Sequence, residues 1–298
     1  MKTKLVMRFV LVIFSLLAEQ SVVKADDRMV IYTVNYPLQY FAQRIAEEQA
    51  EVVFPAPRGI DPAYWNPAAN EVGDYQRADL ILLNGANYAK WLNKVSLPRF
   101  RLINTSRHFS ERYINIESSK THSHGAGADH AHSGTAFTTW LDMQQAIQQA
   151  ELIKQALIKK RPQFSEQFNR NFESLKRDLL AVDKELKETV VVKHKQAVLV
   201  SHPVYQYLAR RYTMNLHSVM LEPDEFPDKA QWKQLEQLKQ KHDVKWIVWE
   251  GQPATESVER LKQLGISSAV FNPCANVPAE GDFLSVMKNN LMELKRVY

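Results

Sequence analysis

The hydrophobic and polar positions of this chain follow two periods, which divide it into three regions. Short apolar runs separated by amphipathic segments fill the first and last thirds. Between them, from Asp142 to about Thr189, apolar residues recur every three or four positions, as they do on one face of a helix. Continuous apolar strands separated by helices indicate a parallel sheet covered on both faces. The pattern predicts an α/β fold of two parallel-sheet lobes joined by a long, rigid backbone helix.

The two outer regions share one order of elements without repeating a sequence. In the first region we expect four strands, at 29–34, 51–54, 79–83 and 100–103, and three helices, at 37–49, 68–78 and 87–95. In the last region we expect four strands, at 197–200, 216–220, 245–249 and 268–271, and four helices, at 203–212, 228–242, 254–264 and 281–296.

The middle region is predicted to be helical with one break. Asp142, with Gln145 three residues later, predicts a helix start, and Pro162 suits the first turn of a second helix. The stretch 163–189 would span roughly 40 Å, more than one small domain needs. We therefore expect a lobe at 26–160, a linker helix at 161–189 and a second lobe at 190–298.

The amino-terminal residues indicate export. Lys2, Lys4 and Arg8 precede an apolar run at 9–18, and small residues near Ala25 suit cleavage. We expect a signal peptide at 1–25 and a periplasmic protein with no membrane insertion, because the run is too short to span a bilayer. No cysteine follows the run, so lipid attachment there is not expected.

Charge and cysteine content narrow the class of protein. Loss of the signal peptide lowers the formal net charge from +5 to +2, because it removes four basic residues and one acidic residue. A charge this small predicts no nucleic-acid partner. The single cysteine, Cys274, allows no internal disulfide. No Gly-x-Ser-x-Gly or phosphate-loop motif occurs, so we expect a binding protein rather than an enzyme.

A histidine-rich loop at 121–133 precedes the helical region. His122, His124, His130 and His132 form two His-x-His pairs among Gly, Ala and Ser residues. Together they can supply four imidazoles to one Zn²⁺ or Cu²⁺. The alternative is a flexible polar linker whose histidines bind nothing.

Further candidates follow the predicted strands, because ligands of open parallel sheets bind at the carboxyl ends of the strands. The first lobe offers Asp61, Tyr64 and Trp65 in the turn after its second strand, and Asn84. The second lobe offers polar or sulfur-bearing side chains after three strands: His202, Glu250, Asn272 and Cys274.

Several of these motifs resemble the metal-specific solute-binding proteins of ABC importers, over essentially the whole mature chain. The shared segments are Gly59-Ile-Asp-Pro62, Asn84-Gly85, Trp140-Leu-Asp142, Ser201-His202 and Glu250. The resemblance implies two lobes joined by a helical backbone, a metal as cargo and a membrane permease as partner. The zinc members often carry a histidine-rich loop before the Trp-Leu-Asp segment.

The resemblance also implies metal ligands, and most of them are replaced. Ala63 and Thr138 stand where the family has histidines, and Asn272 stands near its final aspartate. His202 is retained. One ligand of four does not hold zinc, which takes about four N, S or O donors.

Aromatic and sulfur side chains leave two interpretations open. Trp65 and Trp140 lie in the motifs that lost histidines and suit an organic ligand or a metal chelate, or they pack between the lobes. Cys274, beside Asn272 and His202, provides a soft Cu or Zn site with Glu250, or it is simply buried.

Taken together, the residues predict a monomeric periplasmic component of an ABC importer that captures a divalent metal, zinc first and Cu, Mn or Fe as alternatives, and delivers it to a permease. Two alternatives remain: a cleft that binds a metal chelate or small organic molecule, and a stand-alone periplasmic metal buffer or chaperone.

Overall fold

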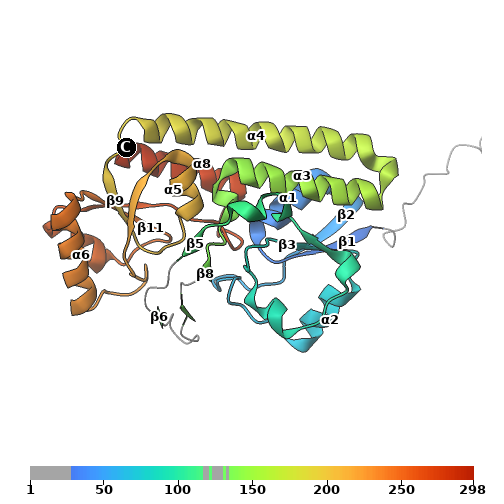
Figure 1. Ribbon diagram of the computed structural model, residues 1–298, viewed down its shortest axis with the longest axis horizontal. Helices are drawn as coiled ribbons and strands as arrows, with labels where there is room; N and C mark the ends of the chain where they lie inside the picture. Colours follow the sequence, from blue (N-terminus) through green and yellow to red (C-terminus); the bar gives the residue numbers. More distant parts are fainter. Residues whose placement is uncertain (1–27, 117–120, 123–129, 132–133) are drawn as a thin grey trace, which may run out of the picture.

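The computed structural model describes residues 28–116, 121–122, 130–131 and 134–298. Two lobes lie toward the two ends of an elongated molecule, and long helices run along one side of both (Figure 1). Each lobe contains a four-stranded sheet whose strands are all parallel. The prediction of two parallel-sheet α/β lobes is confirmed.

The sheet of the N-terminal lobe has the strand order β2-β1-β3-β4. Its central strands are buried because helices cover the sheet, which explains their unbroken apolar sequences. Its elements are β1 (Met29–Thr33), α1 (Tyr36–Ala46), β2 (Ala50–Val53), α2 (Ala69–Arg77), β3 (Leu80–Leu83) and β4 (Leu102–Asn104).

The sheet of the C-terminal lobe has the corresponding order, β10-β9-β11-β12. In both sheets the first strand of the lobe therefore lies between the second and the third. The elements of the C-terminal lobe are β9 (Ala197–Val200), α5 (Gln206–Tyr212), β10 (Asn215–Ser218), α6 (Lys229–His242), β11 (Trp246–Trp249), α7 (Thr255–Gln263), β12 (Ser267–Val270) and α8 (Phe283–Val297).

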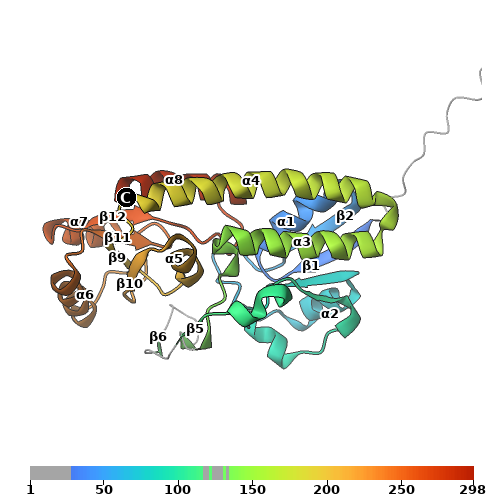
Figure 2. The ribbon, with the colours of Figure 1, turned by 45° about the horizontal axis from the view of Figure 1, so that its top comes forward.

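A helical hairpin joins the lobes. Asp142 caps α3 (Met143–Lys160) by accepting from the backbone N–H groups of Gln144 and Gln145. After Pro162 the chain reverses, and α4 (Ser165–Val191) runs back along α3 and continues to the C-terminal lobe (Figure 2). Among the described helices, none is long and apolar enough to cross a membrane.

Asp183 fixes α4 to its neighbours. Its carboxylate accepts hydrogen bonds from Gln144 of α3, from Arg211 and Tyr212 of α5, and lies 3.2 Å from Lys187 Nζ. Burial raises the pKa of this carboxyl, but the four partners outweigh burial and lower it to about 2. The carboxylate is therefore ionised at neutral pH and ties the hairpin to the C-terminal lobe.

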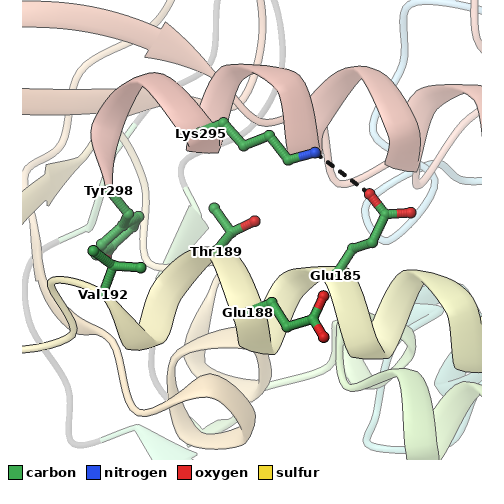
Figure 3. Close-up of a pocket in the computed structure, with 6 residues that line it drawn as sticks. All are labelled: Glu185, Glu188, Thr189, Val192, Lys295 and Tyr298. Atoms are coloured by element: carbon green, nitrogen blue, oxygen red, sulfur yellow. Dashed lines mark ion pairs between the residues drawn. The ribbon is translucent and has the colours of Figure 1, made fainter.

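The last helix, α8, closes the molecule. It packs along α4, and Phe283 at its start contacts Tyr40 and Phe41 of α1, with ring centroids 5.7 and 5.3 Å apart. One continuous hydrophobic core consequently runs through both lobes. Where α4 and α8 end, a surface hollow of about 390 Å³ lies between them, crossed by an ion pair of Lys295 with Glu185 at 3.5 Å (Figure 3).

Two predicted elements of the N-terminal lobe differ in the structure. The predicted helix at 87–95 is a short 3₁₀ helix, Lys90–Lys94, because Gly85, Ala86 and Asn87 all have positive φ and turn the chain first. The predicted strand at 100–103 begins two residues later, since Arg99–Arg101 forms a 3₁₀ turn.

Candidate metal centre

His202 is the central residue of the candidate site. It lies on the turn after β9, and 1% of its side chain is exposed. Its Nε2 is 3.1 Å from Glu222 Oε1, and its Nδ1 is 2.9 Å from Glu250 Oε1. Both ring nitrogens therefore face a carboxylate.

The parallel sheet brings these three residues together. β9 lies between β10 and β11, and His202, Glu222 and Glu250 come after the carboxyl ends of these strands. The buried Ser201 hydroxyl accepts a hydrogen bond from the backbone N–H of Glu250, which fixes one turn against the other. The site lies where ligands of parallel sheets are expected.

The three side chains offer a metal one nitrogen and two oxygen donors. One ligand atom from each residue lies within 4.8 Å of the others, and no other such group of His, Cys, Asp and Glu occurs among the residues that the structure describes. Burial lowers the pKa of His202, but its contacts with Glu222 and Glu250 raise it to about 10, so the imidazolium neutralises one carboxylate. Zn²⁺ accepts this donor set and normally takes a fourth ligand.

The facing edge of the N-terminal lobe presents a different chemistry. Asp61 accepts a hydrogen bond from the backbone N–H of Ala63, which is completely buried. The Thr138 hydroxyl donates to the backbone oxygen of Val204, two residues after His202. Thr138 thus joins the lobes at a position where the resemblance places a metal ligand.

The two tryptophans of the predicted cleft are packed. Trp140 is completely buried, its indole N–H donates to the backbone oxygen of Pro273 at 2.7 Å, and its ring contacts Tyr88. Trp65 is also buried and makes an edge contact with Trp91. These positions agree with the packing interpretation, not with an open aromatic surface.

Asn272 and Cys274 follow β12 and bond to each other. The Asn272 side-chain oxygen accepts from the backbone N–H of Cys274 at 2.7 Å. Burial raises the pKa of the Cys274 thiol to about 12, so the thiol stays protonated at neutral pH. Cys274 is not part of the group around His202. The structure therefore does not bring Cys274 and Glu250 together in a soft metal site.

The histidine-rich segment leaves the lobes on a β stem. β5 (Asn115–Ile116) pairs with β8 (Gly134–Thr135), and Tyr207 of α5 bonds to the backbone at both sides of this stem. Further out, β6 (Thr121–His122) pairs with β7 (His130–Ala131), with His122 opposite His130. His124 and His132 lie outside the described residues.

Glu222 was not among the sequence candidates. It lies in the Pro/Asp/Glu loop, four residues beyond the end of β10. The rule that identified Glu250, a carboxylate after the carboxyl end of a strand, applies to Glu222 too, once the loop is counted with the strand.

Known proteins are similar to this chain over most of its length. The ZnuA family model, described as zinc-uptake complex component A, periplasmic, matches residues 31–297. The zinc-binding lipoprotein AdcA of Streptococcus pneumoniae is 25% identical over 285 residues, which cover 92% of this chain and 56% of that longer protein. The chain therefore spans little more than half the length of that relative. The high-affinity zinc uptake system protein ZnuA of Bacillus subtilis is 24% identical, with 90% of this chain and 87% of that protein covered.

Solved structures share the fold. The metal-dependent lipoprotein YcdH from Bacillus subtilis superposes with a TM-score of 0.77 at 21% identity, covering 90% of this chain and 98% of that chain. The Zn(II)-bound ZnuA-like domain of Streptococcus pneumoniae AdcA gives a TM-score of 0.76 at 23% identity, with the same coverage.

Proposed function

The chain belongs to the ZnuA family of periplasmic zinc-uptake components, and from that premise we propose that it is an exported zinc-binding component of an ABC importer. Zinc is its cargo, and a membrane permease is the partner that receives it. The family match over residues 31–297, the two-lobed fold and the predicted signal peptide at 1–25 support this role.

The observation that carries the proposal is the convergence of His202, Glu222 and Glu250. An imidazole and two carboxylates from three adjacent strand ends form a compact donor set with a negative net charge. Such a set suits a divalent cation with nitrogen and oxygen preference. We propose that these side chains are the zinc ligands of the C-terminal lobe.

The histidine-rich loop is proposed to capture the ion first. His122 and His130 are register partners in the backbone of a two-stranded ribbon, and the sequence adds His124 and His132, so that the loop has four imidazoles. Tyr207 anchors the β5–β8 stem on α5, the helix that follows His202. This attachment joins the base of the loop to the lobe that carries the candidate ligands.

Zinc calorimetry and metal analysis of the exported protein test the site. The intact protein is expected to bind zinc tightly, and deletion of residues 121–133 is expected to slow or weaken capture while tight binding remains. His202→Ala is expected to abolish the tight site. If the loop deletion alone abolishes tight binding, the loop is the principal site and the proposed ligand set is wrong.

Carboxylate variants give a matched control. Glu222→Gln and Glu250→Gln each remove one charged donor, and each should weaken zinc binding by at least the roughly ten- to hundredfold that is typical of a supporting residue. Glu225→Gln changes an exposed carboxylate of the same loop and should leave the affinity unchanged. Equal losses in all three variants would point to general electrostatic attraction instead of ligation.

A chelated metal is a second candidate cargo. The observation that favours it is the confinement of the ligand group to one lobe, since Ala63 and Thr138 offer no comparable donors from the other. A chelate would bring its own remaining ligands. Tighter binding of zinc citrate than of free zinc would favour this candidate, and failure of the gene to restore cellular zinc uptake would favour a metal buffer.

A further inference from the structure

The turn at Lys94–Arg101 presents an unusual side chain to solvent. Phe100 is 77% exposed, the largest value for any large hydrophobic residue in the described part of the chain. Exposure of most of a phenyl ring costs free energy in water, and that free energy is recovered when the ring enters an apolar phase. The metal site does not use this residue.

The ring is held outward by a fixed backbone. Arg101 donates to the backbone oxygens of Gln76 and Ala78 at the end of α2, both at 2.7 Å. Gln76 in turn donates to the backbone oxygen of Ser96 at 2.9 Å. Phe100 therefore sits on a 3₁₀ turn that α2 secures at both sides, and the Arg101 guanidinium lies 5.4 Å from the centroid of its ring.

The surroundings of Phe100 are basic. Lys94, Arg99 and Arg101 lie in the same eight-residue stretch, which contains no acidic residue, and Lys94 and Arg99 are exposed. On the adjacent helix, Arg77 is exposed and pairs with Asp74. The nearby Asp79 accepts a hydrogen bond from the backbone N–H of Val30. The turn itself thus carries three cations and no acid.

We propose that Lys94–Arg101 is a contact surface for an anionic lipid bilayer. Phe100 would insert at the level of the headgroups, and Lys94 and Arg99 would pair with lipid phosphates. An aromatic side chain flanked by cations is the combination that binds the boundary between headgroups and acyl chains. One ring and two or three charges give weak, reversible binding, not anchoring.

The turn lies next to the amino end of one strand of the N-terminal sheet. It leads into the amino end of β4, whereas the strand ends of the candidate metal centre are carboxyl ends. A protein resting on lipid through this turn keeps the carboxyl edge of its N-terminal sheet away from the bilayer. The proposed contact therefore goes beyond the proposed function. It suits a protein that is bound to lipid while it is not docked on a permease.

A second exposed phenylalanine provides an internal control. Phe226 is 53% exposed and follows Asp224 and Glu225 in an acidic loop, and its ring contacts Trp232 at 5.6 Å. An aromatic residue in acidic surroundings is repelled from an anionic surface. Comparison of Phe100 with Phe226 separates the proposed combination from mere exposure.

Vesicle sedimentation of the exported protein tests the proposal. Binding is expected to phosphatidylcholine vesicles that contain phosphatidylglycerol, and it should weaken as NaCl is raised because salt screens the cations. Phe100→Ser should lower the partition coefficient about tenfold. Arg99→Gln and Lys94→Gln should each lower it roughly fivefold. Phe226→Ser should leave it unchanged.

Three results would overturn the proposal: no binding to the anionic vesicles, equal binding to pure phosphatidylcholine vesicles, or equal losses for Phe226→Ser and Phe100→Ser. Zinc affinity and thermal melting of the same variants provide independent readouts. Both should match the unaltered protein, so failure of lipid binding and failure of the zinc proposal are distinguishable.

Discussion

The two sheets have the same strand order but carry opposite chemistry at their carboxyl edges. In the C-terminal lobe the edge holds His202 between two carboxylates. In the N-terminal lobe the centre of the corresponding edge holds neutral amides and hydroxyls, and its one acid named above, Asp61, lies in the segment after β2. Asn84 lies at its centre: its side-chain oxygen accepts from Asn35, Thr139 and Gln149, and its amide donates to the backbone oxygen of Phe137.

The difference shows how one scaffold serves two tasks. Neutral buried groups can satisfy each other completely, so the network of Asn84 fixes the segment that leads into α3. A buried imidazolium between carboxylates depends on charge, and a metal cation can take over that charge. The N-terminal edge is therefore expected to govern stability, and the C-terminal edge to govern binding.

The largest expected effect removes the centre of the C-terminal edge. His202→Ala deletes the nitrogen donor and leaves Glu222 and Glu250 without the cation between them. Zinc affinity should fall on the order of a thousandfold, more than the ten- to hundredfold typical of a supporting residue. Calorimetric titration measures the change, and an affinity within threefold of the unaltered protein would refute the assignment of the edge.

The matching change at the N-terminal edge is Asn84→Ala. It leaves several buried partners without a hydrogen bond, so the free energy of unfolding should fall by about 3 kcal/mol while zinc affinity stays the same. Urea denaturation measures the loss. Asn93→Ala, at an exposed asparagine, serves as the control and should change stability by less than about 0.5 kcal/mol. A lower zinc affinity in Asn84→Ala would contradict the assignment of stability to the N-terminal edge and of binding to the C-terminal edge.

Substitution of Asp183 tests whether the helical hairpin stabilises the lobe that holds the candidate metal centre. Its lowered pKa, about 2, means that it stabilises the fold at pH values above its unfolded pKa near 3.8, and that this contribution is lost as the pH falls toward 2. Asp183→Asn should cost about 2 kcal/mol at pH 7. Denaturation across pH measures it: the two proteins should converge in acid, and a constant difference would exclude the ionic explanation.

The smallest effect concerns the link between the edges. Thr138→Val removes the hydroxyl that donates to the backbone oxygen of Val204, and should lower stability by about 1 kcal/mol. Thermal melting measures this change. Zinc affinity should stay within twofold, because Thr138 is proposed to join the lobes and not to ligate. A tenfold loss of affinity would assign the residue to the metal site.

The fold followed from the sequence because its signals are local. Unbroken apolar runs such as 80–83 predicted the buried parallel strands, and Asp142 began a helix as its cap signature indicated. The reversal at Pro162 was harder to foresee, since α3 and α4 each have an apolar face in either arrangement. The positive φ angles at Ala86 and Asn87 were also hard to predict, because neither position has a glycine.

The candidate site was only partly visible, because it depends on tertiary contacts. His202 and Glu250 were predicted since each lies within two residues of the end of a strand. Glu222 was missed because the loop after β10 returns it to His202 across twenty positions of sequence. The exchange of a metal ligand for an interlobe hydrogen bond at Thr138 appears in the contacts and not in the motif.

The contact of Phe283 with Tyr40 and Phe41 has a consequence for assembly. Residues more than two hundred positions apart complete the same packing, so the shared core stays open until most of the chain has emerged during synthesis or translocation. Contacts of such high sequence separation form slowly, and the unfinished N-terminal lobe meanwhile exposes apolar surface. Chaperones that hold the nascent chain would therefore be needed longest for the residues that are made first.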